Sequence, residues 1–466
     1  MLRLSSFNNA SDAVWKLAIV VRLIHVLLFL ISAYKLDRYD QSSYLSLVQD
    51  LPSSLSPLCI RLLQGLSPFC NWDAEHFSYI TAYGYTTEQS LAFPPGFLLA
   101  IKAGSALVSF LSRLSSPFIS SCFVGAVLSN VFQVMATHYF FVLSNLVLGH
   151  WNIAFKATLI FILSPVNVFS TAAYSESLFC FVTFFGVISL FSINVQPSRD
   201  GVQLVQSKLI PTWSAALLFF CATLIKTFGI FNVVFVFYAI LKCPKSERPG
   251  FFKSLAFLSC CVLPFLIFQG FAAYNLLKSS TYPFESLQQF YKVYGYIQSK
   301  YWNIGKFNFY NIKQLPNFVL ASPLIILCVL SPFIVMTCQY LCGNLARNKS
   351  KAFTSRHGKK FKIVKENTPS EIIQEVFAFH GLGSFHVISF LFHLLVSFSI
   401  IMIFGHVQTI YRLLAFNPLP YWTLSFLMFR SSNSFIVKLF GFLICFLICC
   451  LTFFGSVFFS TFNPFT

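Results

Sequence analysis

The residues with the clearest capacity for chemistry form one short motif, Trp72-Asp73-Ala74-Glu75-His76-Phe77, beside the first apolar segment of the chain. Acidic side chains are costly near lipid and tend to persist there for function. If a helix begins at this motif, Asp73 and His76 lie three residues apart on one of its faces. The Asp73 carboxylate could then act as a general base toward a hydroxyl group, while Glu75 and His76 orient the substrate or tune the base. We therefore predict Asp73, Glu75 and His76 as catalytic residues.

The same motif also has a structural interpretation. Aspartate is a favoured N-cap residue, so Asp73 could simply cap a helix over 74–82, and local sequence alone favours this interpretation. Glu75 and His76 would then be solvated. A second motif, Ala92-Phe93-Pro94-Pro95-Gly96-Phe97, has prolines suited to the first turn of a helix. By itself this motif predicts a plain junction between a loop and a helix.

Polar residues also interrupt two later apolar stretches. Ser164-Pro165-Val166-Asn167 and Ala173-Tyr174-Ser175-Glu176-Ser177 break one stretch twice, as an unwound segment that lines a cavity does. Glu176 there indicates a substrate contact, or alternatively an interfacial loop in water. Lys226 lies within another long apolar stretch. A buried lysine needs an anion such as a carboxylate or phosphate, unless its side chain snorkels to an interface.

Two more polar stretches could bind a substrate. His406-Val407-Gln408-Thr409-Ile410-Tyr411-Arg412 follows an apolar span, and an arginine at a membrane edge can clamp a phosphate through paired donors. The region 278–317 is rich in aromatic and amide side chains, which suit sugar binding but also form interfacial belts, the commoner cause. The predicted substrate-binding residues are Trp72, Glu176, Lys226, Trp302, Asn303, Gln314, His406, Gln408 and Arg412.

The elements that must position these residues are membrane helices. Of the 466 residues, 56% are hydrophobic and only 10% are charged, whereas a soluble domain has roughly 25% charged residues. Apolar runs of about 20 residues recur along the whole chain. We predict an all-α polytopic membrane protein, one integral membrane domain with about eleven transmembrane helices and an active site on its lumenal loops.

The charges around the first span predict its orientation. Arg3 and Lys16 lie on its N-terminal side, which places the N-terminus in the cytoplasm. Continuing along the chain, the C-terminus is expected in the lumen. Three loops follow: a first lumenal loop at 35–112 with the catalytic motif and surface helices, a second at 278–317, and a basic cytoplasmic loop at 343–381.

The region 92–241 allows two topologies. In one topology 92–112 is a full span, and in the other it lies at the lumenal surface while 212–241 forms two short helices broken near Lys226. Such short helices need shielding by neighbours to cross a bilayer of roughly 30 Å. We nevertheless prefer the second topology, because it gathers four polar residues on one side of the membrane: Asp73, Tyr174, Glu176 and Lys226.

Charge and cysteine usage exclude several other classes of protein. The formal net charge is +18, but the basic residues cluster in short loops and form no extended face for nucleic acid. Most of the 14 cysteines lie within apolar runs, where they behave as small apolar residues. Only Cys59 and Cys70 share a polar loop and could pair there. No Cys/His spacing suggests a zinc site, so no metal is expected.

Taken together, the motifs resemble the family of GPI mannosyltransferase II, also called the PIG-V family. The matching elements run in the family's order and cover most of the chain: Trp72–Phe77, Ala92–Phe97, Ser164-Pro165 with Tyr174–Glu176, Tyr301–Gly305, Lys313–Phe318 and His406–Arg412. In two places this chain differs from the family's usual pattern: it has Phe93-Pro94-Pro95-Gly96 for Phe-Phe-Pro-Gly, and Lys226-Thr227-Phe228-Gly229 for Arg-Ser-Asn-Gly.

The resemblance implies a GT-C glycosyltransferase of the endoplasmic reticulum that uses dolichyl-phosphate-mannose on the lumenal side. The expected reaction adds the second, α1,6-linked mannose to the GPI-anchor precursor, with no cofactor. The expected partners are membrane lipids, the precursor glycolipid, the lipid-linked donor and, as an open alternative, a small membrane subunit.

On this basis we expect a direct, inverting displacement. Asp73 would accept the proton of the attacking hydroxyl, and Arg412 or Lys226 would hold the phosphate of the leaving group. The competing interpretations are a transporter or lipid scramblase, and a non-catalytic subunit of a glycosyltransferase complex.

Overall fold

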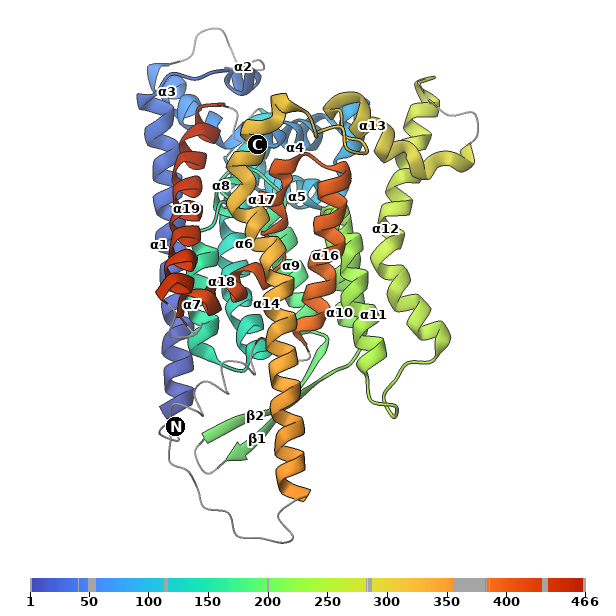
Figure 1. The fold of residues 1–466 in the computed structure, drawn as a ribbon. Helices are drawn as coiled ribbons and strands as arrows, with labels where there is room; N and C mark the ends of the chain where they lie inside the picture. Colours follow the sequence, from blue (N-terminus) through green and yellow to red (C-terminus); the bar gives the residue numbers. More distant parts are fainter. Residues whose placement is uncertain are drawn as a thin grey trace.

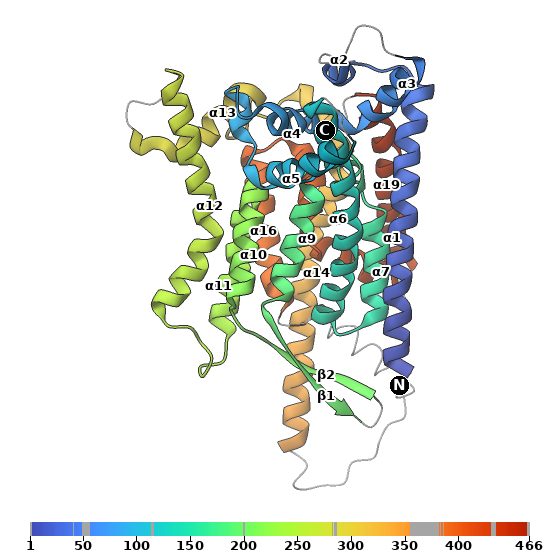
Figure 2. The same cartoon turned by 180° about the vertical axis from the view of Figure 1, so that it is seen from behind.

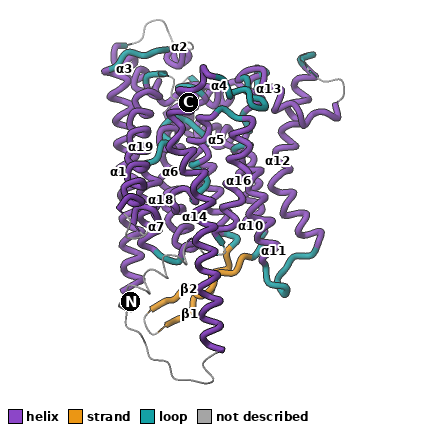
Figure 3. Tube along the Cα trace, viewed as in Figure 1, coloured by secondary structure: helices purple, strands orange, loops and turns teal. Residues whose placement is uncertain are grey.

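The protein is an upright bundle of helices with short helices lying across one end (Figure 1). The tube in Figure 3 shows that helices make up nearly all of the trace, as the sequence predicts. The two termini lie at opposite ends of the bundle (Figure 1). The computed structural model describes these residues: 2–40, 42–48, 56–112, 116–198, 201–281, 283, 287–354, 382, 384, 386–429 and 435–463.

Long apolar helices form the body of the bundle and confirm a multi-pass membrane protein. Within the described residues, six are long and apolar enough to cross a membrane: α1 (Leu2–Lys35), α6 (Pro117–Leu148), α12 (Phe251–Lys278), α14 (Leu315–Thr354), α16 (Val387–Phe404) and α19 (Phe435–Ser460). Six apolar helices are shorter: α5 (Pro95–Ser112), α7 (Trp151–Ile162), α9 (Glu176–Ile188), α10 (Trp213–Ile225), α11 (Val233–Lys242) and α18 (Leu419–Phe429). The number of eleven spans stays a prediction.

The two predicted lumenal loops meet at the end of the bundle that holds the C-terminus (Figures 1 and 2). This end is built from short elements: α2 (Ser42–Val48), α3 (Pro57–Leu66), η1 (Ser67–Cys70), α4 (Asp73–Tyr83), η2 (Gln89–Ala92), η4 (Leu287–Lys292), α13 (Val293–Trp302) and η5 (Ile312–Gln314). Helix α5 lies across the same end beside α4 (Figure 2). The orientation of α5 across this end agrees with the preferred topology, and the placement of 92–112 at the lumenal surface stays a prediction.

Glycines explain how α5 and the interrupted helix pair α10–α11 fit together. A Cβ at Gly96 would lie 2.7 Å from the backbone nitrogen of Ile225, so glycine allows the start of α5 to pack on the end of α10. A Cβ at Gly229 would likewise lie 2.5 Å from the backbone of Thr223. The break predicted near Lys226 is confirmed: α10 ends at Ile225, and the 3₁₀ turn η3 (Thr227–Asn232) precedes α11.

The opposite end carries the N-terminus and an element that the sequence analysis missed (Figure 1). Strands β1 (Phe191–Ser198) and β2 (Gly201–Leu209) pair in antiparallel register. The dipeptide Asp200-Gly201, whose glycine begins β2, is a hairpin signal in the sequence. The basic loop between α11 and α12 lies at this end too. Helix α14 runs toward it as far as Thr354, and the remainder of the basic loop at 355–381 lies outside the described residues.

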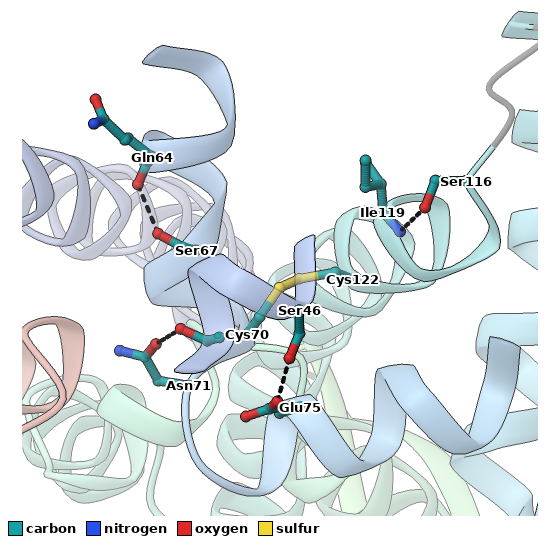
Figure 4. The surroundings of a disulfide bond; sticks show 10 residues. Ser46, Gln64, Ser67, Cys70, Asn71, Glu75, Ser116, Ile119 and Cys122 are labelled. Carbon is teal, nitrogen blue, oxygen red and sulfur yellow. Dashed lines mark hydrogen bonds between the residues drawn. A yellow bond between two sulfur atoms is a disulfide. The ribbon is translucent and has the colours of Figure 1, made fainter. Parts of the chain in front are cut away.

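A disulfide bond joins η1 to the start of α6, and it corrects the cysteine prediction. Cys70 pairs with Cys122, with 5.9 Å between their Cα atoms, whereas Cys59 is free and exposed. Figure 4 shows the bond between the catalytic-motif region and α6. The pairing was missed because Cys122 belongs to an apolar helix in sequence, yet the fold brings that helix's first turns beside the polar loop.

Candidate active site

Asp73 is the first residue of α4, but it does not cap the helix. The N-cap position is Trp72, which has a φ of 60° and makes no capping hydrogen bond through its side chain. The backbone N–H of Asp73 donates to the Tyr174 hydroxyl over 3.1 Å. Its carboxylate is bound instead to Arg412, 339 residues further along the chain. The cap interpretation of Asp73 is therefore wrong.

Four charged side chains form a continuous chain of ion pairs in the order Asp73, Arg412, Glu176 and Lys226. Arg412 Nη2 bonds Asp73 Oδ2, and Arg412 Nε lies 2.9 Å from Glu176 Oε1. Lys226 Nζ bonds the same Glu176 oxygen. Two carboxylates and two cations sum to zero, so the site is neutral when all four are ionised.

Burial differs along this chain of charges. The Glu176 side chain is only 1% exposed, whereas those of Asp73 and Arg412 are 28% and 23% exposed. The guanidinium carbon of Arg412 lies 5.1 Å from the ring centre of Tyr174 and 5.4 Å from that of Phe169. Such contacts add cation–π attraction to the ion pairs. Arg412 is therefore fixed by two acids and two rings, and part of it stays accessible.

The neighbouring cation dominates the protonation of Asp73. Burial alone would raise the pKa of its carboxyl group, but the charge and hydrogen bond of Arg412 outweigh burial and hold this pKa below its ordinary value. Burial alone would lower the pKa of Arg412, but Glu176 and Asp73 raise it above the usual value for arginine. Both groups are consequently ionised at neutral pH.

Three interruptions in the helices bring the charges together, and one of them is the break at Lys226 between α10 and η3. Helix α7 ends at Ile162, and residues 163–175 continue through the single turn α8 (Val166–Phe169) before α9 begins at Glu176. The break predicted from the sequence is thus confirmed. Arg412 lies in α17 (Ile410–Leu413), directly after the turn η7 (Val407–Thr409). Each charged residue except Asp73 therefore sits where an apolar helix starts, stops or breaks.

A cavity of about 820 Å³ opens over these charges. It is lined by eight of the predicted site residues: Trp72, Asp73, Glu176, Lys226, Trp302, His406, Gln408 and Arg412. Apolar side chains from α16 and η3 form another part of the wall, with Ile400, Phe404 and Phe228 among them. The cavity therefore combines charges, amide and aromatic groups, and an apolar side.

Four predicted residues lie outside the cavity lining. Glu75 accepts a hydrogen bond of 2.6 Å from Ser46 near the disulfide (Figure 4). His76 stacks on Phe93 with 5.0 Å between the ring centres. Asn303 ends α13 in the left-handed conformation, with a φ of 52°. These three residues shape the surroundings of the cavity.

Gln314, the fourth of these residues, reaches the cavity wall indirectly. Its side-chain oxygen accepts from Asn317 over 2.6 Å, and Asn317 accepts from Gln408 over 3.1 Å. Sequence reasoning did not single out Tyr294, which also lines the cavity. The backbone N–H of Tyr294 donates to Gln269 of α12 over 2.7 Å, which fixes α13 against that helix. The aromatic run of 278–317 was the available signal, but it did not distinguish Tyr294 from its neighbours.

Comparison with known proteins identifies the family. The profile of the mannosyltransferase (PIG-V) family matches residues 11–466. The chain is 32% identical over 419 residues to the GPI alpha-1,6-mannosyltransferase 2 of Cricetulus griseus. The aligned region covers 79% of this chain and 74% of the relative. The chain belongs to the mannosyltransferase (PIG-V) family. This PIG-V member is also 34% identical to the Homo sapiens protein of the same name over 333 residues, 62% of each chain.

Fungal relatives are more distant. The GPI mannosyltransferase 2 of Cryptococcus neoformans is 30% identical over 280 residues, 57% of this PIG-V chain and 62% of the relative. The crystal structure of the Archaeoglobus fulgidus oligosaccharyltransferase in the apo form covers 95% of this chain and 56% of its own, with 13% identity and a TM-score of 0.37. That likeness is too distant to carry an argument. Family membership makes this chain a glycosyltransferase and sets aside the transporter interpretation.

Proposed function

We propose that this PIG-V member transfers mannose from dolichyl-phosphate-mannose to the GPI-anchor precursor, adding the second, α1,6-linked mannose on the lumenal side of the endoplasmic reticulum. The observation that carries the proposal is the placement of one accessible carboxylate, Asp73, and two cations, Arg412 and Lys226, on a single cavity. Mannose transfer from a phosphate needs a base for the acceptor hydroxyl and positive charge for the leaving phosphate.

In the proposed reaction, the 6-hydroxyl oxygen of the acceptor mannose attacks the anomeric carbon of the donor. The bond between that carbon and the phosphate oxygen breaks, dolichyl phosphate leaves with the electron pair, and the configuration inverts. Asp73 takes the hydroxyl proton. The leaving phosphate is a good anion and needs no acid, so Arg412 and Lys226 serve to neutralise its growing charge.

The ion pair between Asp73 and Arg412 has a role in this sequence. Arg412 lowers the pKa of Asp73, which makes the carboxylate a weak base. A bound donor phosphate would compete with Asp73 for the exposed side of Arg412. Because the cation is then shared, the pKa of Asp73 rises toward its ordinary value and the carboxylate becomes a better base. Donor binding therefore prepares the base.

The rest of the cavity offers contacts for the sugars. Trp72 and Trp302 supply aromatic faces, while His406 and Gln408 supply hydrogen-bonding groups. Asn303 and Gln314 support this wall from behind, the latter through Asn317. The proposal assigns the base to Asp73 alone, because Glu75 and His76 lie outside the cavity lining.

The proposed orientation places the end with Asp73 in the lumen and the N-terminus in the cytoplasm. Two observations support it. The basic loop between α11 and α12 lies at the N-terminal end, as expected of a cytoplasmic loop. The Cys70–Cys122 disulfide lies at the other end, and disulfides form in oxidising compartments.

Purified protein in detergent, with dolichyl-phosphate-mannose and a GPI precursor that carries one mannose, tests the function directly. We expect the precursor to gain one hexose that an α1,6-specific mannosidase removes, and we expect the activity to persist in EDTA. Transfer by the chain alone would show that no partner subunit is required. An absence of transfer both by the pure protein and by membranes that contain it would contradict the proposal.

A further inference from the structure

We propose that Arg22, within the candidate membrane span of α1, is a positioning residue for mannose transfer. It holds the unwound segment 163–175 in the shape that presents Tyr174 and Glu176 to the site. The inference rests on the proposed function of the Asp73 cavity, and it concerns a residue that does not line this cavity. Its support is the set of hydrogen bonds from Arg22 to this segment, together with the contacts that Tyr174 and Glu176 at the segment's end make with Arg412.

Arg22 is a buried cation whose described hydrogen-bond partners are all neutral groups. Arg22 is only 5% exposed. Nη2 donates to the Asn167 side-chain oxygen over 2.8 Å and to the Asn167 carbonyl over 3.2 Å. Nη1 donates to the same carbonyl over 3.3 Å and to the Thr171 hydroxyl over 3.2 Å. None of the ion pairs in the described part of the chain includes Arg22. Charged residues within membrane spans usually serve function.

Asn167 passes the effect of Arg22 to the end of α7. The Asn167 amide group donates to the carbonyls of Phe161, Ile162 and Ser164, over 3.2, 2.6 and 2.9 Å. The last carbonyls of a helix have no partner within the helix and must be satisfied by other groups. Arg22 and Asn167 together therefore stabilise the point where α7 stops and the unwound segment starts.

Helix α6 holds the other end of the same segment. The Asn130 amide donates to the Thr171 carbonyl over 3.0 Å. The Ser129 hydroxyl donates to the Tyr174 carbonyl over 2.8 Å and accepts from the Tyr174 N–H over 3.1 Å. Because backbone inside a membrane must be paired, these side chains replace the helical bonds that the segment lacks.

The segment ends in the site itself. The Tyr174 hydroxyl accepts the N–H of Asp73, and the Tyr174 ring lies against Arg412. Glu176 pairs with both Arg412 and Lys226. If Arg22 is lost, the segment can relax, and Tyr174 and Glu176 no longer fix Arg412 beside Asp73. Misplacement of such groups by about 1 Å can reduce turnover by about 10²-fold.

The chain offers a matched control on the same helix. His25 is also 5% exposed, and its Nδ1 pairs with the Ser456 hydroxyl of α19 over 3.0 Å. No hydrogen bond described for His25 reaches the segment 163–175. Replacing His25 therefore disturbs a buried polar contact of α1 while leaving the Arg22 hydrogen bonds to Asn167 and Thr171 available.

The test compares purified Arg22→Gln, Arg22→Lys and His25→Gln with the wild type in the mannose-transfer assay. For Arg22→Gln we expect a fall in kcat of about 10- to 100-fold. We also expect the acid limb of the kcat/KM profile of this variant to move to higher pH. The reason is that Arg412 lowers the pKa of Asp73 less when Arg412 is no longer fixed beside Asp73. The kcat and the acid limb of Arg22→Lys should lie between those of the wild type and Arg22→Gln, since lysine keeps the charge but lacks the paired donors. His25→Gln should keep the wild-type acid limb.

Two results would overturn this role for Arg22. One is an acid limb that stays in place in both Arg22 variants, and the other is an equal shift in the His25 variant. If Arg22→Gln does not fold, the pH profile of Arg22→Lys decides the question. Failure of the proposed function is distinguishable, because the wild type itself would then transfer no mannose.

Discussion

Arg412 and Arg22 are both held by several protein groups, but their surroundings differ in kind. Arg412 pairs with the carboxylates of Asp73 and Glu176 on an open cavity, and its side chain is 23% exposed. Arg22 bonds only carbonyl, amide and hydroxyl groups within the helix bundle and is 5% exposed. One arginine therefore faces space that a ligand can enter, whereas the other is enclosed by protein.

The difference shows what an arginine can do in each setting. An incoming phosphate can replace one carboxylate partner of Arg412, because it offers the same charge and the same paired acceptors. No anion can reach Arg22 without opening the bundle, so its charge fixes the backbone instead. In our account Arg412 takes part in the reaction, and Arg22 acts only by positioning other residues.

The largest effect that would sharpen this comparison concerns Arg412 itself. Arg412→Gln removes the cation from the leaving phosphate and leaves two carboxylates beside a single lysine. We expect kcat to fall by about 10²–10³-fold, more than for Arg22→Gln, with partial recovery in Arg412→Lys. Steady-state kinetics of the purified variants measure this order. A smaller loss at Arg412 than at Arg22 would break the comparison.

Inhibition by the product, dolichyl phosphate, distinguishes the roles of Arg412 and Arg22 through a binding constant rather than a rate. Dolichyl phosphate should inhibit the wild type by occupying the phosphate position beside Arg412 and Lys226. In Arg412→Gln its inhibition constant should rise by about tenfold, the value of one charge-assisted hydrogen bond. In Arg22→Gln it should change far less, since Lys226 and the Arg412 charge are retained. Equal weakening in both variants would argue that Arg22 also holds the phosphate.

The pH dependence tests whether the donor frees Asp73. The charged and titratable groups around its carboxylate are Arg412, His76, Lys226, Tyr174, Glu176 and Tyr294. Arg412 lowers the pKa of Asp73, so the acid limb of kcat/KM, which reports the free enzyme, should lie below the ordinary value of about 3.9. In the complex the phosphate shares Arg412, so the acid limb of kcat should lie at higher pH. The reverse order of the two limbs would show that donor binding does not release Asp73, and activity regained at neutral pH controls for denaturation.

The smallest expected effect concerns glycosylation, where we predict no modification of the native sequons. The comparison assumes that Arg412 lies at the lumenal end and that α1 enters from the cytoplasm. The sequons Asn9-Ala10-Ser11 and Asn348-Lys349-Ser350 would then stay unmodified, so glycosidase treatment should not alter the electrophoretic mobility of the protein. A sequon introduced near Leu58 in the first lumenal loop provides the positive control. A mobility shift for either native sequon would invert the proposed orientation.

Much of the architecture could be predicted because long apolar runs carry their own signal. The positions of α12 and α19 and the break at Lys226 follow from local hydrophobicity interrupted by Pro, Gly or a charge. The β-hairpin at the other end was missed, although Asp200-Gly201 is a recognisable turn signal. The two strands lie between the apolar helices α9 and α10, where hydropathy alone indicates only a polar connection.

The connections of the site could not be predicted, because they join residues far apart in sequence. Asp73 resembles a helix cap locally, and only the fold reveals Arg412 as its partner, 339 residues away. Cys122 and Arg22 were missed for the same reason, since each lies in an apolar helix whose neighbours the sequence does not specify. Motifs could indicate which residues were chemically able to act, but not which partners hold them.

The most direct test of the central claim is rescue of surface GPI-anchored proteins in cells that lack this mannosyltransferase. Wild type, Asp73→Asn and Glu75→Gln would be compared at matched expression, since Glu75 lies two residues away on α4 but bonds Ser46 outside the cavity lining. Loss of a general base lowers the rate by about 10²–10⁴-fold. We therefore predict rescue by wild type and Glu75→Gln, and no rescue by Asp73→Asn. Full rescue by Asp73→Asn would contradict the assignment of the base.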